Sequence, residues 1–151
     1  MKRYLVLATL IALTGTAIAQ DQAVRVKPDQ ITFKDNPTIP KGGQSAVLVG
    51  DPTKGQVAVT RVKFPANYMI PPHTHPYAEV VTVISGTVGF GSGDVFDKAK
   101  GEVVKAGTVN ALPAKQSHFV WTEDEEVVLQ IQFVGPAGID YVNPSDDPRK
   151  K

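Results

Sequence analysis

Cysteine is absent from the 151 residues of this chain. Without it there is no disulfide framework, no thiolate metal site and no cysteine nucleophile. An excess of one charge is also missing, because 16 Lys and Arg stand against 15 Asp and Glu. This balance argues against nucleic acid or an anionic membrane surface as the main partner. Only 3 histidines are present, so the position of each one is informative.

Sustained helical periodicity is missing beyond residue 20. The apolar runs are short and alternate with a period of two, which is typical of strands. Such runs lie at residues 56–64, 79–85, 87–90, 102–105, 108–112, 118–122 and 126–134. Turn signals rich in Gly and Pro separate them, as expected among 13 glycines and 12 prolines. Many short strands at close spacing predict an all-β sandwich or barrel.

The first residues have the three-part build of a secretory signal peptide. Lys2 and Arg3 open the chain, residues 5–19 are uncharged and mostly apolar, and a small-x-small pattern ends at Ala19. We expect cleavage before Gln20, export to the periplasm or the medium, and no stable membrane insertion. The apolar run is short for a span of ~20 residues. An uncleaved N-terminal anchor is the alternative.

The rest of the chain reads as one domain with two polar flanks. Residues 1–19 form the signal peptide, and residues 20–45 form an N-terminal arm with room for one edge strand. Residues 46–135 hold the strand signals of a barrel. Residues 136–151 are polar and contain proline, so they are predicted to be a C-terminal tail outside the core.

Three side chains near the middle of the chain have the spacing of metal ligands. His73 and His75 are separated by one residue, and Glu79 follows after three more. In a strand, residues i and i+2 point to the same face, so the two imidazoles lie side by side. Imidazoles with a carboxylate suit a divalent transition metal: Fe, Mn, Ni, Cu, Co or Zn. Hydrogen-bonded core histidines are the alternative.

Two stretches of the chain resemble the paired motifs of the cupin superfamily. The first motif is G-x5-H-x-H-x(3,4)-E-x6-G, and this chain matches it at His73, His75, Glu79 and Gly86, with Asn67 at the opening glycine. The second motif is G-x5-P-x-G-x2-H-x3-N. This chain matches it at Gly107, Pro113 and His118, with Lys115 at the middle glycine and Thr122 at the closing asparagine. The departures fall on turn and framework positions.

This resemblance implies a single-domain jelly-roll β-barrel with one metal near a mouth of the barrel. It implies His73, His75, Glu79 and His118 as the metal ligands. Four protein ligands leave up to two octahedral positions open, as a catalytic or ligand-binding metal requires. More narrowly, the chain resembles small, secreted, single-domain cupins of the type-2 conserved-barrel kind. Members are often dimers, so a homodimer is compatible with the resemblance.

Strand alternation predicts which side chains line a small-molecule pocket beside the ligands. Val81 and Val83 follow Glu79 on one face, and Val120 follows His118. Tyr68 and Met69 precede the first ligand and are expected at the mouth. Gln130 and Gln132 either line the cavity or face solvent, and solvent is favoured because the opposite face of their strand is apolar.

The resemblance suggests oxygen-dependent chemistry on a small organic substrate. If the chain is an enzyme, it would be a metal-dependent oxidoreductase of the dioxygenase type. A non-catalytic periplasmic protein that binds a metal or a small ligand is the alternative. A structural metal site in an interaction module is a third interpretation. No second acid or base near the metal is evident from the sequence.

Overall fold

The computed structural model describes residues 23–151, and the predicted signal peptide lies outside them. These residues form strands and short 3-10 helices, with no α-helix among them. The strands are β1 (Lys34–Asp35), β2 (Gln44–Val49), β3 (Val57–Phe64), β4 (Met69–Thr74), β5 (Glu79–Ser85), β6 (Thr87–Ser92), β7 (Gly101–Lys105), β8 (Val109–Leu112), β9 (His118–Thr122), β10 (Val127–Val134) and β11 (Asp140–Tyr141). The 3-10 helices are η1 (Pro28–Gln30), η2 (Lys98–Lys100), η3 (Pro144–Asp146) and η4 (Pro148–Lys150). Within residues 23–151 no helix is long and apolar enough to cross a membrane.

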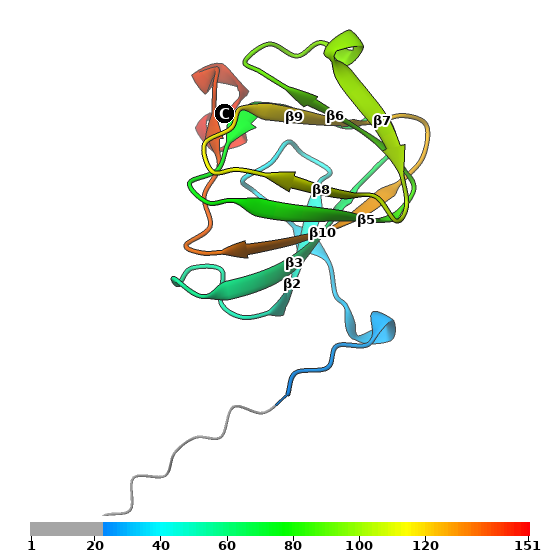
Figure 1. Cartoon of the computed structure of the whole chain (residues 1–151), viewed down its shortest axis with the longest axis vertical. Coiled ribbons are helices and arrows are strands. Elements are labelled where there is room, and N and C mark those ends of the chain that lie inside the picture. Colours follow the sequence, from blue (N-terminus) through cyan, green and yellow to red (C-terminus); the bar gives the residue numbers. More distant parts are fainter. Residues whose placement is uncertain (1–22) are drawn as a thin grey trace, which may run out of the picture.

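The strands pair into two antiparallel sheets. One sheet has the order β1-β2-β3-β10-β5-β8, and the other has the order β11-β4-β9-β6-β7. Figure 1 shows β9, β6 and β7 in one layer, above the layer of β8, β5, β10, β3 and β2. Strands that are neighbours in a sheet often lie far apart in the chain, as β10 does between β3 and β5. This jelly-roll barrel confirms the predicted all-β fold class.

The core lies between the sheets and follows the alternation of the strands. In β10, Val127, Leu129 and Phe133 are buried, while the residues between them are more exposed. Leu129 pairs with Val62 of β3 on one side and Val83 of β5 on the other. Apolar residues at matched registers therefore meet on the same inner face, which gives the sheet its buried side.

Strand β9, which begins at the third histidine, is buried along its whole length. Phe119 and Trp121 pack on its far side, where Gly89 and Gly91 of β6 lie next to them. A Cβ at Gly89 would overlap the indole ring, so only glycine leaves room for Trp121. This packing fixes β9 against β6 and thereby holds His118 at its start.

The flanks predicted to lie outside the core contribute to it. Strand β11 pairs with β4, with Tyr141 opposite His73, and both Ile139 and Tyr141 belong to the buried core. Ile39 of the N-terminal arm is buried in the same core, and β1 pairs with β2. The prediction that residues 136–151 are a tail is therefore wrong. Ile139 and Tyr141 do alternate, but the run is only a few residues long and lies in a mostly polar segment, so the sequence analysis did not assign it to a strand.

Candidate metal centre

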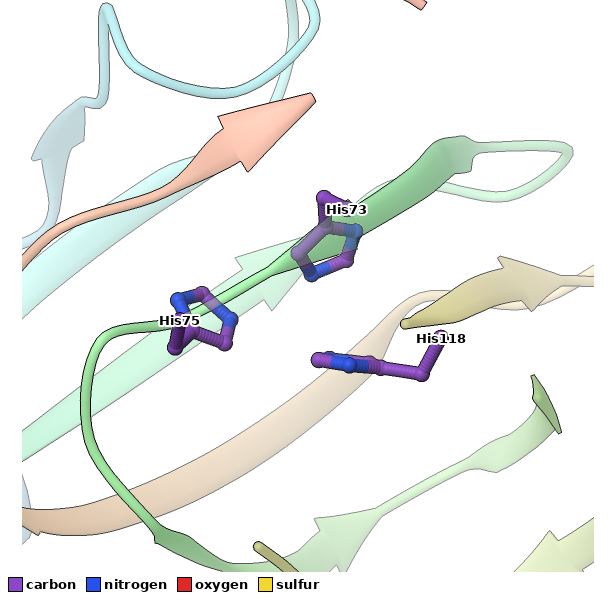
Figure 2. A group of neighbouring side chains, drawn as sticks. All are labelled: His73, His75 and His118. Atoms are coloured by element: carbon purple, nitrogen blue, oxygen red, sulfur yellow. The ribbon is translucent and has the colours of Figure 1, made fainter. Parts of the chain in front are cut away.

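Three histidines from two distant parts of the chain meet on one side of the barrel. His73 lies in β4, His75 follows directly after β4, and His118 is the first residue of β9. His73 and His118 are cross-strand partners, which explains how residues 45 positions apart come together. One ring nitrogen from each of the three lies within 4.8 Å of the others. Figure 2 shows the three imidazoles gathered around one space.

A backbone carbonyl orients each imidazole. Nδ1 lies 2.7 Å from the carbonyl oxygen of Pro71 for His73, 2.6 Å from that of Gly138 for His75, and 3.0 Å from that of Gln116 for His118. A carbonyl oxygen only accepts, so each Nδ1 carries the hydrogen and each neutral ring keeps a lone pair on Nε2. Metal-ligating histidines are oriented in this way by their outer partners.

The carboxylate of Glu79 completes the set. Glu79 is buried at the start of β5, and its Oε1 lies 3.2 Å from Nε2 of His118 and 3.7 Å from Nε2 of His75. Neutral imidazole nitrogens and carboxylate oxygens are all electron-pair donors, so these side chains can share one cation placed between them. Three imidazole nitrogens and one carboxylate oxygen therefore fit a single divalent transition metal.

Electrostatics keep two of the histidines ready to bind a metal. Burial lowers the pKa of His73 well below its ordinary value, and the neighbouring rings of His118 and His75 lower it further. Burial also lowers the pKa of His75, although Glu79 acts in the opposite direction. A histidine must be neutral to bind a metal. Both side chains are therefore neutral, and able to act as ligands, at neutral pH.

The two positions where the chain lacks the motif glycine keep a glycine-like backbone. Asn67 has a φ of 56° and Lys115 a φ of 64°, both in the left-handed region. The amide of Lys115 donates a hydrogen bond of 2.8 Å to the carbonyl oxygen of His75. This hydrogen bond ties the loop that carries His75 to the turn that precedes His118, although Lys115 replaces the motif glycine.

A cavity of about 360 Å³ adjoins the four candidate ligands. Its wall is mainly apolar and comes from both sheets. Apolar wall residues from the strands include Val62, Ile70, Val81, Val120, Leu129 and Ile131. Val81 and Val120 thus lie where alternation predicts. Val83 does not line the cavity and is buried in the core instead.

The other predicted pocket residues lie away from this wall. Tyr68 is buried against Phe64, with its hydroxyl donating to the carbonyl oxygen of Pro40, and Met69 is exposed. Gln130 and Gln132 are also absent from the wall, because Leu129, Ile131 and Phe133 line it from the opposite face of β10. The side chain of Gln130 accepts a hydrogen bond from Arg61. The structure therefore favours the outward-facing alternative for both glutamines.

Several residues at the site were not assigned a role from the sequence. Tyr77 follows His75 in the ligand loop, and its ring stacks on His75 at 5.1 Å and on Phe133 at 4.3 Å between centroids. Gly138 supplies the carbonyl oxygen that orients His75, and Arg149 lies on the cavity wall. The alternation of apolar residues in β10 predicts Phe133 on the core side. No pattern or motif in the sequence predicts that the C-terminal segment, with Gly138 and Arg149, lies at the site.

Comparison with known proteins agrees with this architecture. A family model described as Cupin matches residues 35–137, which is more than half of the chain. No curated protein matches the chain. Among solved structures, the polyketide cyclase RemF from Streptomyces resistomycificus superposes with a TM-score of 0.69 at 18% identity, covering 85% of this chain and 92% of that chain.

Two further solved structures share the fold. A cupin 2 conserved barrel domain protein from Leptotrichia buccalis has a TM-score of 0.52 at 27% identity, covering 64% of this chain and 42% of that one. Oxalate oxidase in complex with the substrate analogue glycolate has a TM-score of 0.59 at 22% identity, covering 85% of this chain and 68% of that chain. From the family match and the barrel with its histidine and glutamate cluster, we conclude that the chain belongs to the cupin family.

Proposed function

We propose that this protein holds one divalent transition metal through His73, His75, Glu79 and His118 and acts on a small organic molecule in the adjoining cavity. The observation that carries the proposal is the convergence of three oriented Nε2 lone pairs and a buried carboxylate on the wall of a largely apolar cavity. Pockets of this character are typical small-molecule sites.

When bound, such a metal with open coordination positions supplies Lewis-acid activation and, for Fe, Mn or Cu, one-electron chemistry with dioxygen. The carbonyl oxygens of Pro71, Gly138 and Gln116 keep the rings in one orientation and one tautomer. The mainly apolar wall lowers the local dielectric constant around a molecule bound in the cavity, which strengthens electrostatic interactions there. We therefore propose an oxygen-dependent oxidoreductase.

The test begins with metal analysis of the protein isolated from its native compartment. We expect one transition metal ion per chain, and we expect nitric oxide to shift its spectrum by occupying an open position. A protein that binds no transition metal would contradict the proposal. A bound metal that does not respond to nitric oxide would indicate a closed, structural site.

A non-catalytic metal- or ligand-binding protein is the second candidate, and one observation favours it. Among residues 23–151, the titratable groups on the cavity wall besides the four ligands are Tyr77 and Arg149. Burial and the nearby Glu79 raise the pKa of Tyr77, so its hydroxyl stays protonated at neutral pH and cannot act as a general base. Turnover of bound ligand with consumption of dioxygen distinguishes the enzyme from the binding protein.

We also propose that the protein is a small exported cupin of the conserved-barrel type. The charged start and the apolar run of residues 1–19 support export. N-terminal sequencing of exported protein should begin within a residue or two of Gln20, whereas a chain that still starts at Met1 would contradict cleavage. The homodimer stays a prediction, and light scattering of the purified protein tests it.

A further inference from the structure

A second cavity lies at the seam between the two sheets, where strand pairing does not close the barrel. Among residues 23–151, β8 is the end strand of one sheet and β7 is the end strand of the other, so no ladder of hydrogen bonds joins them. A short turn at residues 105–108 connects them, and Figure 1 shows the two strands diverging from it. A cavity of about 550 Å³, here called the seam cavity, is lined mostly by β6, β7 and β8 together with Gln116 and His118.

The seam cavity meets the candidate metal centre at His118. His118 and Phe90 line both this cavity and the apolar cavity beside the four candidate ligands. Phe90 pairs with Val120, which lines the apolar cavity, and with Glu102, which lines the seam cavity. The half-buried ring of Phe90 and the imidazole of His118 therefore stand between the two spaces, and the ligand set is reached from both.

The wall of the seam cavity is more polar than that of the apolar cavity. It carries four uncharged polar side chains and one residue of each charge: Ser92, Thr108, Asn110, Gln116, Lys100 and Glu102. Asn110 pairs with the buried Val81, so its amide lies on the inner side of the sheet. An enclosed water molecule needs about two to four polar partners, and side chains of this kind supply them. The seam cavity therefore suits water and small polar solutes.

A single exposed hydrogen bond between side chains spans the seam cavity beside His118. The Nε2 of Gln116 donates to the Oγ of Ser92 at 3.3 Å. Ser92 is the cross-strand partner of His118, and the carbonyl oxygen of Gln116 orients the imidazole of His118. A long, exposed hydrogen bond of this kind is weak. The two side chains can therefore separate while the backbone that positions His118 stays in place.

Resting on the proposed metal site, we propose that the seam cavity is a second entrance to the metal centre, which admits water and small polar solutes. An organic molecule in the apolar cavity blocks the approach from that side. A small second reactant, or water, then needs a separate approach to an open coordination position. The polar side chains of the seam cavity line that approach, and the pair of Ser92 and Gln116 is its gate.

The test uses the full chain loaded with Co²⁺, whose visible spectrum changes when a further ligand binds, and azide is the probe. Cobalt content is measured first, and stopped-flow absorbance then gives the rate constant of azide association. Asn110→Phe fills the seam cavity, and the milder Asn110→Leu keeps the side-chain volume but removes the amide. Both variants should slow association at least several-fold with unchanged cobalt content. Gln116→Ala removes the gate and should speed association.

Two further variants show which cavity azide uses. Thr82→Phe is the matched control for added bulk, because Thr82 follows Val81 in β5, faces the other side of the sheet and lines neither cavity. Val47→Phe narrows the apolar cavity from a half-exposed position on its wall. Neither substitution should change the rate of azide association appreciably.

The outcomes separate this inference from the proposed function. Unchanged association in both Asn110 variants overturns the second entrance, even if cobalt is fully bound. Slow association in Val47→Phe, at the rate seen in the Asn110 variants or below it, also overturns it, because azide then enters through the apolar cavity. An unchanged rate in Gln116→Ala overturns the gate. Failure of the chain to hold cobalt overturns the metal site itself, and with it the proposed function.

Discussion

At the scale of single residues, the metal site depends on one link between distant parts of the chain. His118 comes from β9, whereas the other three candidate ligands lie within residues 73–79. His118→Ala should therefore lose most of the bound metal. Gln132→Ala is the matched control, because Gln132 lies on the same barrel but off the cavity wall, and it should keep full occupancy. Metal content per folded chain is the measurement, and full occupancy in His118→Ala would contradict the assignment.

Glu79 is the one anionic residue among the four candidate ligands, and a glutamine at this position can separate the effect of its charge from that of its shape. Glu79→Gln keeps the side-chain volume and removes the charge. We expect the variant to fold and to bind a divalent ion on the order of 10–100-fold more weakly. Titration with a metal-buffered indicator measures this change. Equal affinity in the variant would show that Glu79 does not contact the metal.

Lys115 occupies a turn position that suits glycine. Its φ of 64° destabilises the folded chain by about 1–2 kcal/mol relative to glycine. A glycine would remove this strain, but it would also give the unfolded chain more conformational entropy, which offsets part of the gain in stability. Lys115→Gly should therefore raise the free energy of unfolding by up to about 1 kcal/mol. Asn67→Gly should change it less, because asparagine tolerates the left-handed region. Urea unfolding of both variants checks the order, and destabilisation by Lys115→Gly would contradict it.

At the scale of elements, the C-terminal segment forms part of the site. The guanidinium of Arg149 binds the carbonyl oxygen of Ile139, and the neighbouring carbonyl oxygen of Gly138 orients His75. Arg149→Ala should loosen this segment and weaken metal binding several-fold, up to about ten-fold. The control is Lys150→Ala. The Nζ of Lys150 lies 4.0 Å from Oδ2 of the same Asp147, but its side chain is largely exposed, so its loss should leave metal binding unchanged. Equal metal affinity in the two variants would show that the segment does not orient His75.

At the scale of the whole molecule, a metal bound only by the folded chain must stabilise it. The ligands come from β4, the loop after it, β5 and β9, so an unfolded chain does not assemble them. Free metal at a hundred times its dissociation constant should add about 2.7 kcal/mol to the free energy of unfolding. Thermal melts before and after chelation measure the gain. Coincident melts would argue against a preformed site.

The metal-free protein should lose stability in mild acid. The pKa values of His73 and His75 are lowered in the folded chain, whereas an unfolded histidine titrates near 6.5. Below about pH 6.5 the unfolded chain therefore binds protons that the folded chain does not, and stability falls as the pH falls. The slope is at most about 1.4 kcal/mol per pH unit for each histidine. Urea unfolding between pH 7.5 and 5.5 should show it, and a flat profile would contradict it.

Local patterns in the sequence determined much of this protein. Strand periodicity and the spacing of His73, His75 and Glu79 involve residues a few positions apart, and a strand places such residues without help from distant contacts. The all-β class and the ligand cluster were predicted on this basis, together with the motif resemblance. The same local alternation placed Val81 and Val120 on the cavity wall.

Tertiary structure alone decided what surrounds the ligands. Tyr77 meets Phe133, and Gly138 meets His75, across more than fifty residues of chain, which no local period can reveal. Ile139 and Tyr141 alternate over only three positions of a mostly polar segment, and the pairing of β11 with β4 places them in the core. Tyr68 does not lie at the mouth of the cavity, where it was expected, because its ring packs on Phe64. The shape of the cavity is set by contacts between strands that are far apart in the chain. A local sequence pattern therefore cannot predict it, and only the packing of the two sheets determines it.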